Sequence, residues 1–231
     1  MRDLSLDRML LGAGLVYIVL QGVAFAVLPA QPATTAGADE VTAYFGANRD
    51  VFGVVLYITA LAQVVLLWFL GGLRIFLGRL EGAGHALARV AHASGLMAAS
   101  MLFATTIVSG ALTVRPVSAP GRETMLAVFD MFNFGFGMSG LPLGGLLIAA
   151  GLVLLRARAW TWLGWLGVLA GALQLISTLG VVVDGGPLAL GGPVENISDV
   201  LMLGWIALAS VVFWRRSAWE RVSALRPEVT A

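Results

Sequence analysis

Six long apolar stretches, separated by short polar segments, limit the possible folds of this chain more than any other feature. They cover residues 9–28, 51–73, 90–114, 124–155, 159–183 and 199–214. About 20 apolar residues in a helix, rising about 1.5 Å each, cross the hydrocarbon core of a bilayer. Because that core offers no water to unpaired backbone groups, each stretch is predicted to be helical. The predicted fold class is all-α: a polytopic membrane protein with a single six-transmembrane-helix bundle.

The composition agrees with a membrane protein and excludes several kinds of chemistry. Charged residues make up 12% of the chain, against about 25% in soluble domains. There is no Cys and no Lys, which excludes disulfides, thiolate sites and Schiff-base lysines. His85 and His92 have only Glu81 nearby as a third ligand, so neither a metal site nor a cofactor is predicted.

The distribution of arginine predicts the orientation in the membrane. Three arginines lie on one side: Arg49, Arg115 and Arg122. The other eleven lie on the opposite side: Arg2, Arg8, Arg74, Arg79, Arg89, Arg156, Arg158, Arg215, Arg216, Arg221 and Arg226. Since positive residues stay in the cytoplasm, both termini and the tail 215–231 are predicted to be cytoplasmic. An all-Arg basic set is typical of a GC-rich bacterial genome, so the predicted location is a bacterial inner membrane.

Asp130 and Asn133 lie inside the fourth apolar stretch, three positions apart and therefore on one helix face. A carboxylate at mid-membrane costs about 2.5–3.5 kcal/mol on insertion scales, so something must compensate it. One interpretation is a proton acceptor or ligand-binding group in an outward-facing cavity. The other is an ion pair with Arg49, Arg115 or Arg122 that locks helix ends together.

Pro142 predicts a kink in the same stretch. It has no N–H to donate to the carbonyl of Met138, and its ring pushes against the preceding turn. The surrounding glycines predict close helix packing, or alternatively a hinge or a homo-oligomer through glycine-rich faces. Two pairs follow the small-xxx-small pattern: Gly140 with Gly144, and Gly167 with Gly171.

Four further polar residues lie in or beside apolar stretches. Gln63 and Gln174 are near the middle of theirs, whereas Glu195 and Asp199, four positions apart, lie at the outer start of the sixth. Hydrogen bonds between helices and a polar pocket are both consistent with this pattern. The predicted ligand-binding set is Asp130, Asn133, Gln63, Gln174, Glu195, Asp199 and Arg49; no catalytic residue is predicted.

Three segments together resemble a family of small multi-pass bacterial membrane proteins described only as a domain of unknown function (DUF4386). They are Asn48–Gly53 (NRDVFG), the glycine-rich run Gly135–Gly145, and Leu154–Gly164 (LLRARAWTWLG). The resemblance extends over about Met9 to Val183. It implies a fold and no activity.

Three functions are compatible with these features. The leading hypothesis is a non-enzymatic binder of a small apolar or lipidic ligand, or an accessory membrane subunit. The alternatives are a proton-coupled transporter using Asp130, and a membrane enzyme acting on a lipid or isoprenoid substrate. In the enzyme, Asp130 with Glu195 or Asp199 would be the acid–base pair. The expected partners are the lipid bilayer and anionic headgroups at the basic face, and no nucleic acid.

The orientation can be tested with single cysteines, because the chain has none of its own. We expect Ala36→Cys to react with a membrane-impermeant thiol reagent added to intact cells. Ala224→Cys should react only after the cells are permeabilised. Labelling of Ala224→Cys in intact cells would reverse the predicted topology.

Overall fold

A computed structural model describes residues 3–82, 84–114, 121–183 and 185–224, and these residues form helices and no strand. The helices are α1 (Asp3–Val27), α2 (Ala38–Ala47), α3 (Arg49–Glu81), α4 (Ala86–Val114), α5 (Arg122–Met138), α6 (Gly140–Arg156), α7 (Thr161–Ser177), the short 3₁₀ helix η2 (Thr178–Val182) and α8 (Pro193–Ala224). The predicted all-α bundle is confirmed.

Six segments of the described chain are long and apolar enough to cross a bilayer, and the protein is a multi-pass membrane protein. They are 8–27, 49–81, 86–113, 122–156, 161–182 and 193–215, with α5 and α6 together forming the fourth. Several helices extend past the predicted apolar stretches, because helical hydrogen bonding continues beyond the hydrocarbon core. The largest extension is in α8, which runs to Ala224 through most of the predicted cytoplasmic tail.

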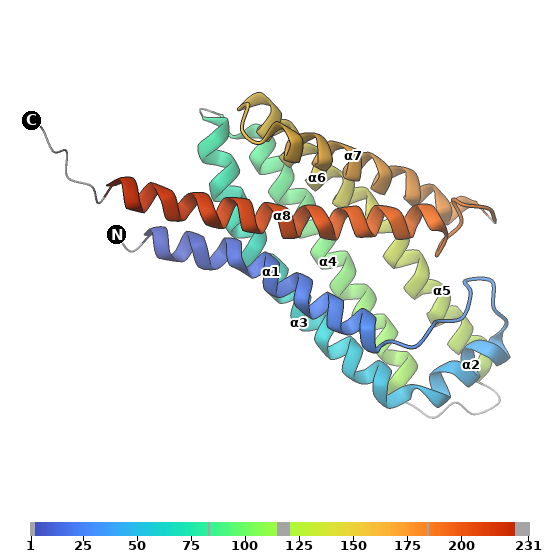
Figure 1. Cartoon of the computed structure of the whole chain (residues 1–231). Coiled ribbons are helices and arrows are strands. Elements are labelled where there is room, and N and C mark those ends of the chain that lie inside the picture. Colours follow the sequence, from blue (N-terminus) through green and yellow to red (C-terminus); the bar gives the residue numbers. More distant parts are fainter. Residues whose placement is uncertain (1–2, 83, 115–120, 184, 225–231) are drawn as a thin grey trace, which may run out of the picture.

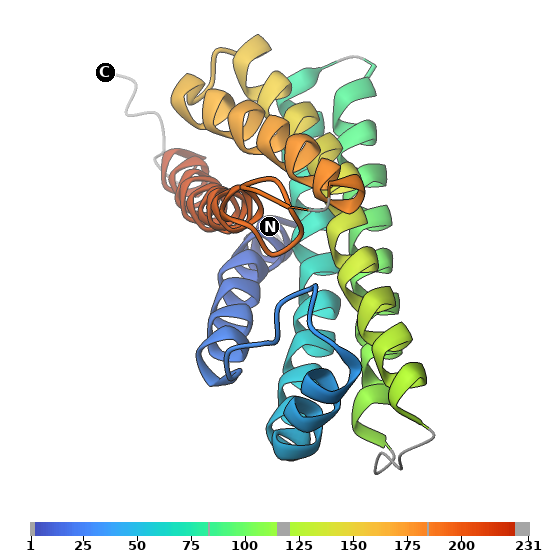
Figure 2. The same ribbon diagram turned by 90° about the vertical axis from the view of Figure 1, so that its right-hand side faces the viewer.

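The long helices pack as antiparallel neighbours around one main core (Figures 1 and 2). α1 packs against α3 and α8, α6 packs against α4 and α7, and α7 also packs against α8. The guanidinium of Arg8, near the start of α1, lies 4.7 Å from the ring centre of Trp214, near the end of α8. Fully buried Trp205 donates its indole N–H to the carbonyl of Leu163, 3.0 Å away, and so joins α8 to α7.

One helix lies within the segment between the first two spans, where the sequence indicated only a polar stretch. α2 lies beside the starts of α3 and α5 (Figure 1). It buries Val41 and Phe45, and the Phe45 ring packs edge-on against Phe52, 4.7 Å between centres. Asp39 of α2 also pairs with Arg122 at the start of α5. α2 therefore covers this end of the bundle with a second, smaller hydrophobic core.

The glycines of α6 and α7 bring the two backbones into contact. A Cβ added at Gly151 would lie 2.6 Å from the carbonyl oxygen of Gly164. At Gly144 it would lie 2.9 Å from the carbonyl oxygen of Gly171, and the reverse distance is 2.8 Å. The predicted small-residue faces are therefore used for packing within the chain, while a homo-oligomer stays a prediction.

The fourth span is interrupted at Ser139, between α5 and α6. The interruption is adjacent to Met138. The carbonyl of Met138 receives no backbone hydrogen bond from Pro142, because proline has no N–H. The Ser139 hydroxyl donates to the carbonyl of Phe136 at 2.6 Å, and the Thr178 hydroxyl lies 3.4 Å from the carbonyl of Gly137. Side chains thus supply hydrogen bonds where the regular helix pattern is disturbed.

Because α6 and α7 approach closely, adding one methyl group at their contact should destabilise the protein. Gly151→Ala should lower the free energy of unfolding by about 1–3 kcal/mol, because two backbones must separate. Gly22→Ala is the matched control: Gly22 lies on α1 with nothing within 4 Å of an added Cβ. Thermal unfolding in detergent measures both, and equal stability of the two variants would contradict the packing account.

Candidate functional site

Helical periodicity brings polar and aromatic side chains together at one end of the bundle. Gln21 and Phe25 lie four positions apart on α1, as do Phe132 and Phe136 on α5, and such residues share a helix face. α4 contributes a stripe of hydroxyls: Thr105, Thr106 and Ser109. On α8, Glu195 and Asp199 are again four apart. These faces converge near the ends of α1, α4 and α5 and near the start of α8, with the first half of α3 beside them.

The converging faces enclose a cavity of about 370 Å³. Its lining is Gln21, Ala24, Phe25, Leu28, Pro29, Gln31, Phe52, Val55, Leu56, Thr59, Gln63, Leu102, Thr105, Thr106, Ser109, Phe132, Asn133, Phe136, Leu190, Gly191, Glu195, Asn196 and Asp199. A narrower pocket of about 30 Å³ shares Gln21, Asp199 and four other lining residues with it. This pocket extends about one helical turn further along α1, to Tyr17.

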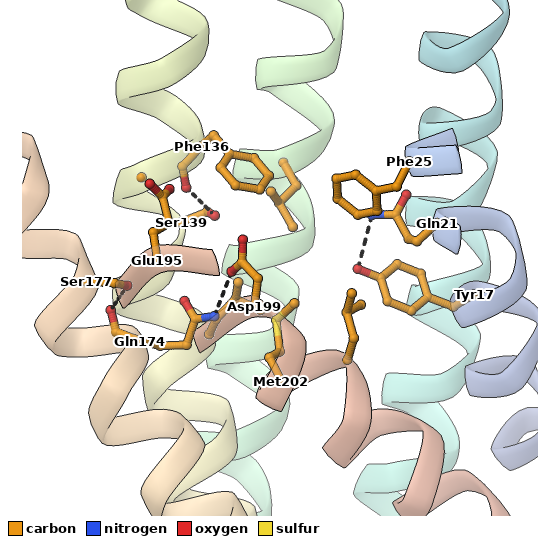
Figure 3. A pocket seen from close by; sticks show the side chains of 14 residues that line it. Tyr17, Gln21, Phe25, Phe136, Ser139, Gln174, Ser177, Glu195, Asp199 and Met202 are labelled. Atoms are coloured by element: carbon orange, nitrogen blue, oxygen red, sulfur yellow. Dashed lines mark hydrogen bonds between the residues drawn. The ribbon is translucent and has the colours of Figure 1, made fainter. Parts of the chain in front are cut away.

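Asp199 connects the cavity to the glycine-rich helix α7. Its Oδ1 accepts a hydrogen bond of 2.9 Å from the side-chain amide of Gln174, which is 2% exposed (Figure 3). The backbone carbonyl of Gln174 in turn accepts hydrogen bonds from the hydroxyls of Ser177 and Thr178, each at 2.9 Å. One turn earlier on α8, Glu195 accepts a hydrogen bond from the backbone N–H of Gly191. Both carboxylates are thereby held in place.

Gln63 provides the clearest sign of an incomplete polar site. Its side chain is 2% exposed and lines the large cavity, yet its Oε1 has no hydrogen-bond partner among the described residues. A buried unpaired polar atom costs about 1–3 kcal/mol. Arg8 Nε, Thr42 Oγ1 and His92 Nδ1 are also buried without a hydrogen-bond partner among the described residues, but Gln63 alone of these four lines the cavity.

Most of the predicted ligand-binding residues are brought together. Gln63, Asn133, Glu195 and Asp199 line the large cavity, and Gln174 lines the narrow pocket.

The two other predicted residues lie elsewhere. Asp130 is exposed and is not part of the cavity lining, because α5 turns Phe132, Asn133 and Phe136 toward the cavity. Arg49 donates from Nε to the carbonyl of Thr113, joining the start of α3 to the end of α4. Of the arginines predicted to pair with Asp130, Arg122 binds Asp39 instead, and Arg115 lies outside the described residues.

Sequence reasoning missed the aromatic and hydroxyl part of the lining. Tyr17, with 2% exposure, and Gln21 form the wall opposite Asp199 in Figure 3, their side chains 3.5 Å apart. The four-residue spacings of Tyr17, Gln21 and Phe25 on α1, and of Thr105 and Ser109 on α4, were the available signals. They indicate a shared face but not what the face contacts.

Comparison with protein-family models, curated proteins and solved structures gave no match. The resemblance to a bacterial membrane-protein family therefore stays a prediction. Among the described residues, no group of three or more His, Cys, Asp and Glu side chains is placed to hold a metal ion. The site must therefore be interpreted from its own side chains: carboxylates, amides and hydroxyls arranged around aromatic rings.

The Gln174–Asp199 hydrogen bond can be measured by a double-mutant cycle. Gln174→Leu should lower the free energy of unfolding by about 1–3 kcal/mol, because it leaves a carboxylate in the bundle without its donor. Gln174→Leu combined with Asp199→Leu should cost less than the sum of the single changes. Strict additivity in thermal unfolding would mean that the two side chains do not interact.

Proposed function

We propose that this membrane protein binds a small amphiphilic molecule, such as a lipid-like compound, in the cavity between α1, α3, α4, α5 and α8. The volume of about 370 Å³ falls within the range of about 300–1,000 Å³ that is typical of ligand pockets. Its lining combines apolar and aromatic side chains with convergent polar groups, and each kind supplies about half of the residues. The observation that carries the proposal is the buried Gln63 oxygen in the wall of this cavity, which has no partner in the described part of the chain.

The membrane orientation proposed from the arginine distribution indicates the side of the membrane from which the ligand would enter the cavity. The cavity lies at the end of the bundle opposite the links 82–85 and 157–160, which join the Arg-rich helix ends. In a bacterial inner membrane with cytoplasmic termini, this end faces outward. The ligand would then come from the outer leaflet or from the space beyond it.

A proton-coupled carrier is the second candidate, with Asp199 in the role first given to Asp130. Asp199 lies in the shared wall of the cavity and the narrow pocket, whereas Asp130 lines neither. Ionisable residues of transporters usually face the bundle interior or a cavity. A pH-gradient assay in proteoliposomes separates a carrier from a simple binder.

A cavity-filling substitution tests the proposed binding site. Thr106→Trp should remove any copurified ligand detected by native mass spectrometry, because the indole occupies cavity volume. Ile107→Trp is the control, since the neighbouring side chain is 64% exposed and points away from the cavity. Equal ligand content in both variants, each folded by thermal unfolding, would refute the proposed site.

A further inference from the structure

Three polar side chains of the cavity lining donate hydrogen bonds to backbone carbonyls of their own helices. The Thr106 hydroxyl donates to the carbonyl of Leu102 at 2.8 Å, and the Ser109 hydroxyl donates to the carbonyl of Thr106 at 2.9 Å. An amide N–H of Asn133 donates to the carbonyl of Phe129 at 3.0 Å. Each of these three side chains retains oxygen lone pairs and can accept a hydrogen bond from a ligand.

The charged residues that line the cavity and the narrow pocket are acidic. Glu195 and Asp199 are both acidic, and no Arg or His occurs among the described residues that line the two cavities. The N–H groups that hold these carboxylates come from neutral donors, the Gln174 amide and the Gly191 backbone. A carboxylate in a poorly hydrated space is best compensated by a cation that also donates hydrogen bonds.

Gln63, on another helix, also needs a hydrogen-bond donor. Its unpaired Oε1 is an acceptor, and it lies on α3 whereas the carboxylates lie on α8. A ligand that hydrogen-bonds both to Gln63 on α3 and to the carboxylates on α8 must therefore have several hydrogen-bond donors. The rings of Phe25 and Phe136 border the space next to Asp199 in Figure 3, and their faces attract cations.

Building on the proposed function, we infer that the cavity recognises a protonated amine on an amphiphilic molecule. An ammonium group carries a positive charge and up to three N–H donors, whereas an alcohol offers one donor and no charge. Asp199 is the main counter-ion and Glu195 the second. The apolar body of the ligand lies along the aromatic and aliphatic lining. A carboxylate or phosphate headgroup is rejected, because it adds negative charge and acceptors to a site that already has both.

Three probes that share one apolar body test this specificity. They are phenylbutylamine, phenylbutanol and phenylbutanoate, titrated calorimetrically into the full-length protein in phosphatidylcholine nanodiscs, with empty nanodiscs as the blank. We expect the amine to bind about tenfold or more tightly than the alcohol, and the carboxylate to bind weakest.

Two substitutions assign the preference to residues. Asp199→Asn keeps the size and the acceptor for Gln174 but removes the charge, so it should abolish most of the amine preference and leave alcohol binding within about twofold. Asp130→Asn is the matched control, an exposed acid outside the cavity, and should change neither. Glu195→Gln, expected to have a smaller effect, replaces Asp199→Asn if that variant fails to fold.

The outcomes separate the two proposals. Equal affinity for amine and alcohol in the unmodified protein would overturn the amine specificity and leave the cavity as a general amphiphile site. A preference that survives in both Asp199→Asn and Glu195→Gln would also overturn it. If none of the probes binds, or if Thr106→Trp leaves their binding unchanged, the proposed function itself fails.

Discussion

The bilayer core contains almost no water, and every polar group placed there must find its partner within the protein. This constraint explains the helices, and it also explains how they are joined. An apolar side chain gains little by moving from lipid to a contact between helices. Helices in a membrane therefore associate by close packing and by hydrogen bonds between them. The glycine contact of α6 with α7, and the bonds Gln174–Asp199 and Trp205–Leu163, are interactions of this kind.

The same constraint determines the chemistry of the cavity. In a helix without water, hydroxyl and amide side chains donate to carbonyls of the preceding turn, as Thr106, Ser109 and Asn133 do here. The hydroxyl hydrogens of Thr106 and Ser109 and one amide hydrogen of Asn133 are then used, while the oxygen lone pairs remain. A polar cavity made from such side chains is biased toward acceptors before any acid is added. Glu195 and Asp199 strengthen this bias and give it a charge.

The number and approximate positions of the spans could be predicted from the sequence, because length and apolarity alone decide whether a helix can cross a bilayer. A disturbance of the fourth span and close packing at its glycines were expected from Pro142 and the small-xxx-small pairs. The structure has the interruption at Ser139, three residues before Pro142, and packs Gly144 against Gly171 of the neighbouring helix. The choice between Asp130 and Asp199 could not be predicted. Both acids look alike in sequence, and only the rotation of each helix against its neighbours puts one in the cavity wall and leaves the other exposed. α2 was missed because the residues that it buries, Val41 and Phe45, are too few to distinguish a short helix from a loop.

The arrangement also shows how an incomplete polar site can persist in a stable bundle. Leaving Gln63 Oε1 unpaired and a carboxylate beside a cavity costs stability, and sites of function are where such costs are retained. α7 is packed against α6 through glycines and against α8 through Trp205, so the helix that carries Gln174 has little freedom to move. Gln174 therefore holds Asp199 from a helix that is itself closely packed on two sides. Under the proposed function, a carboxylate held in this way is in position before a ligand arrives, and binding energy is not spent on arranging it.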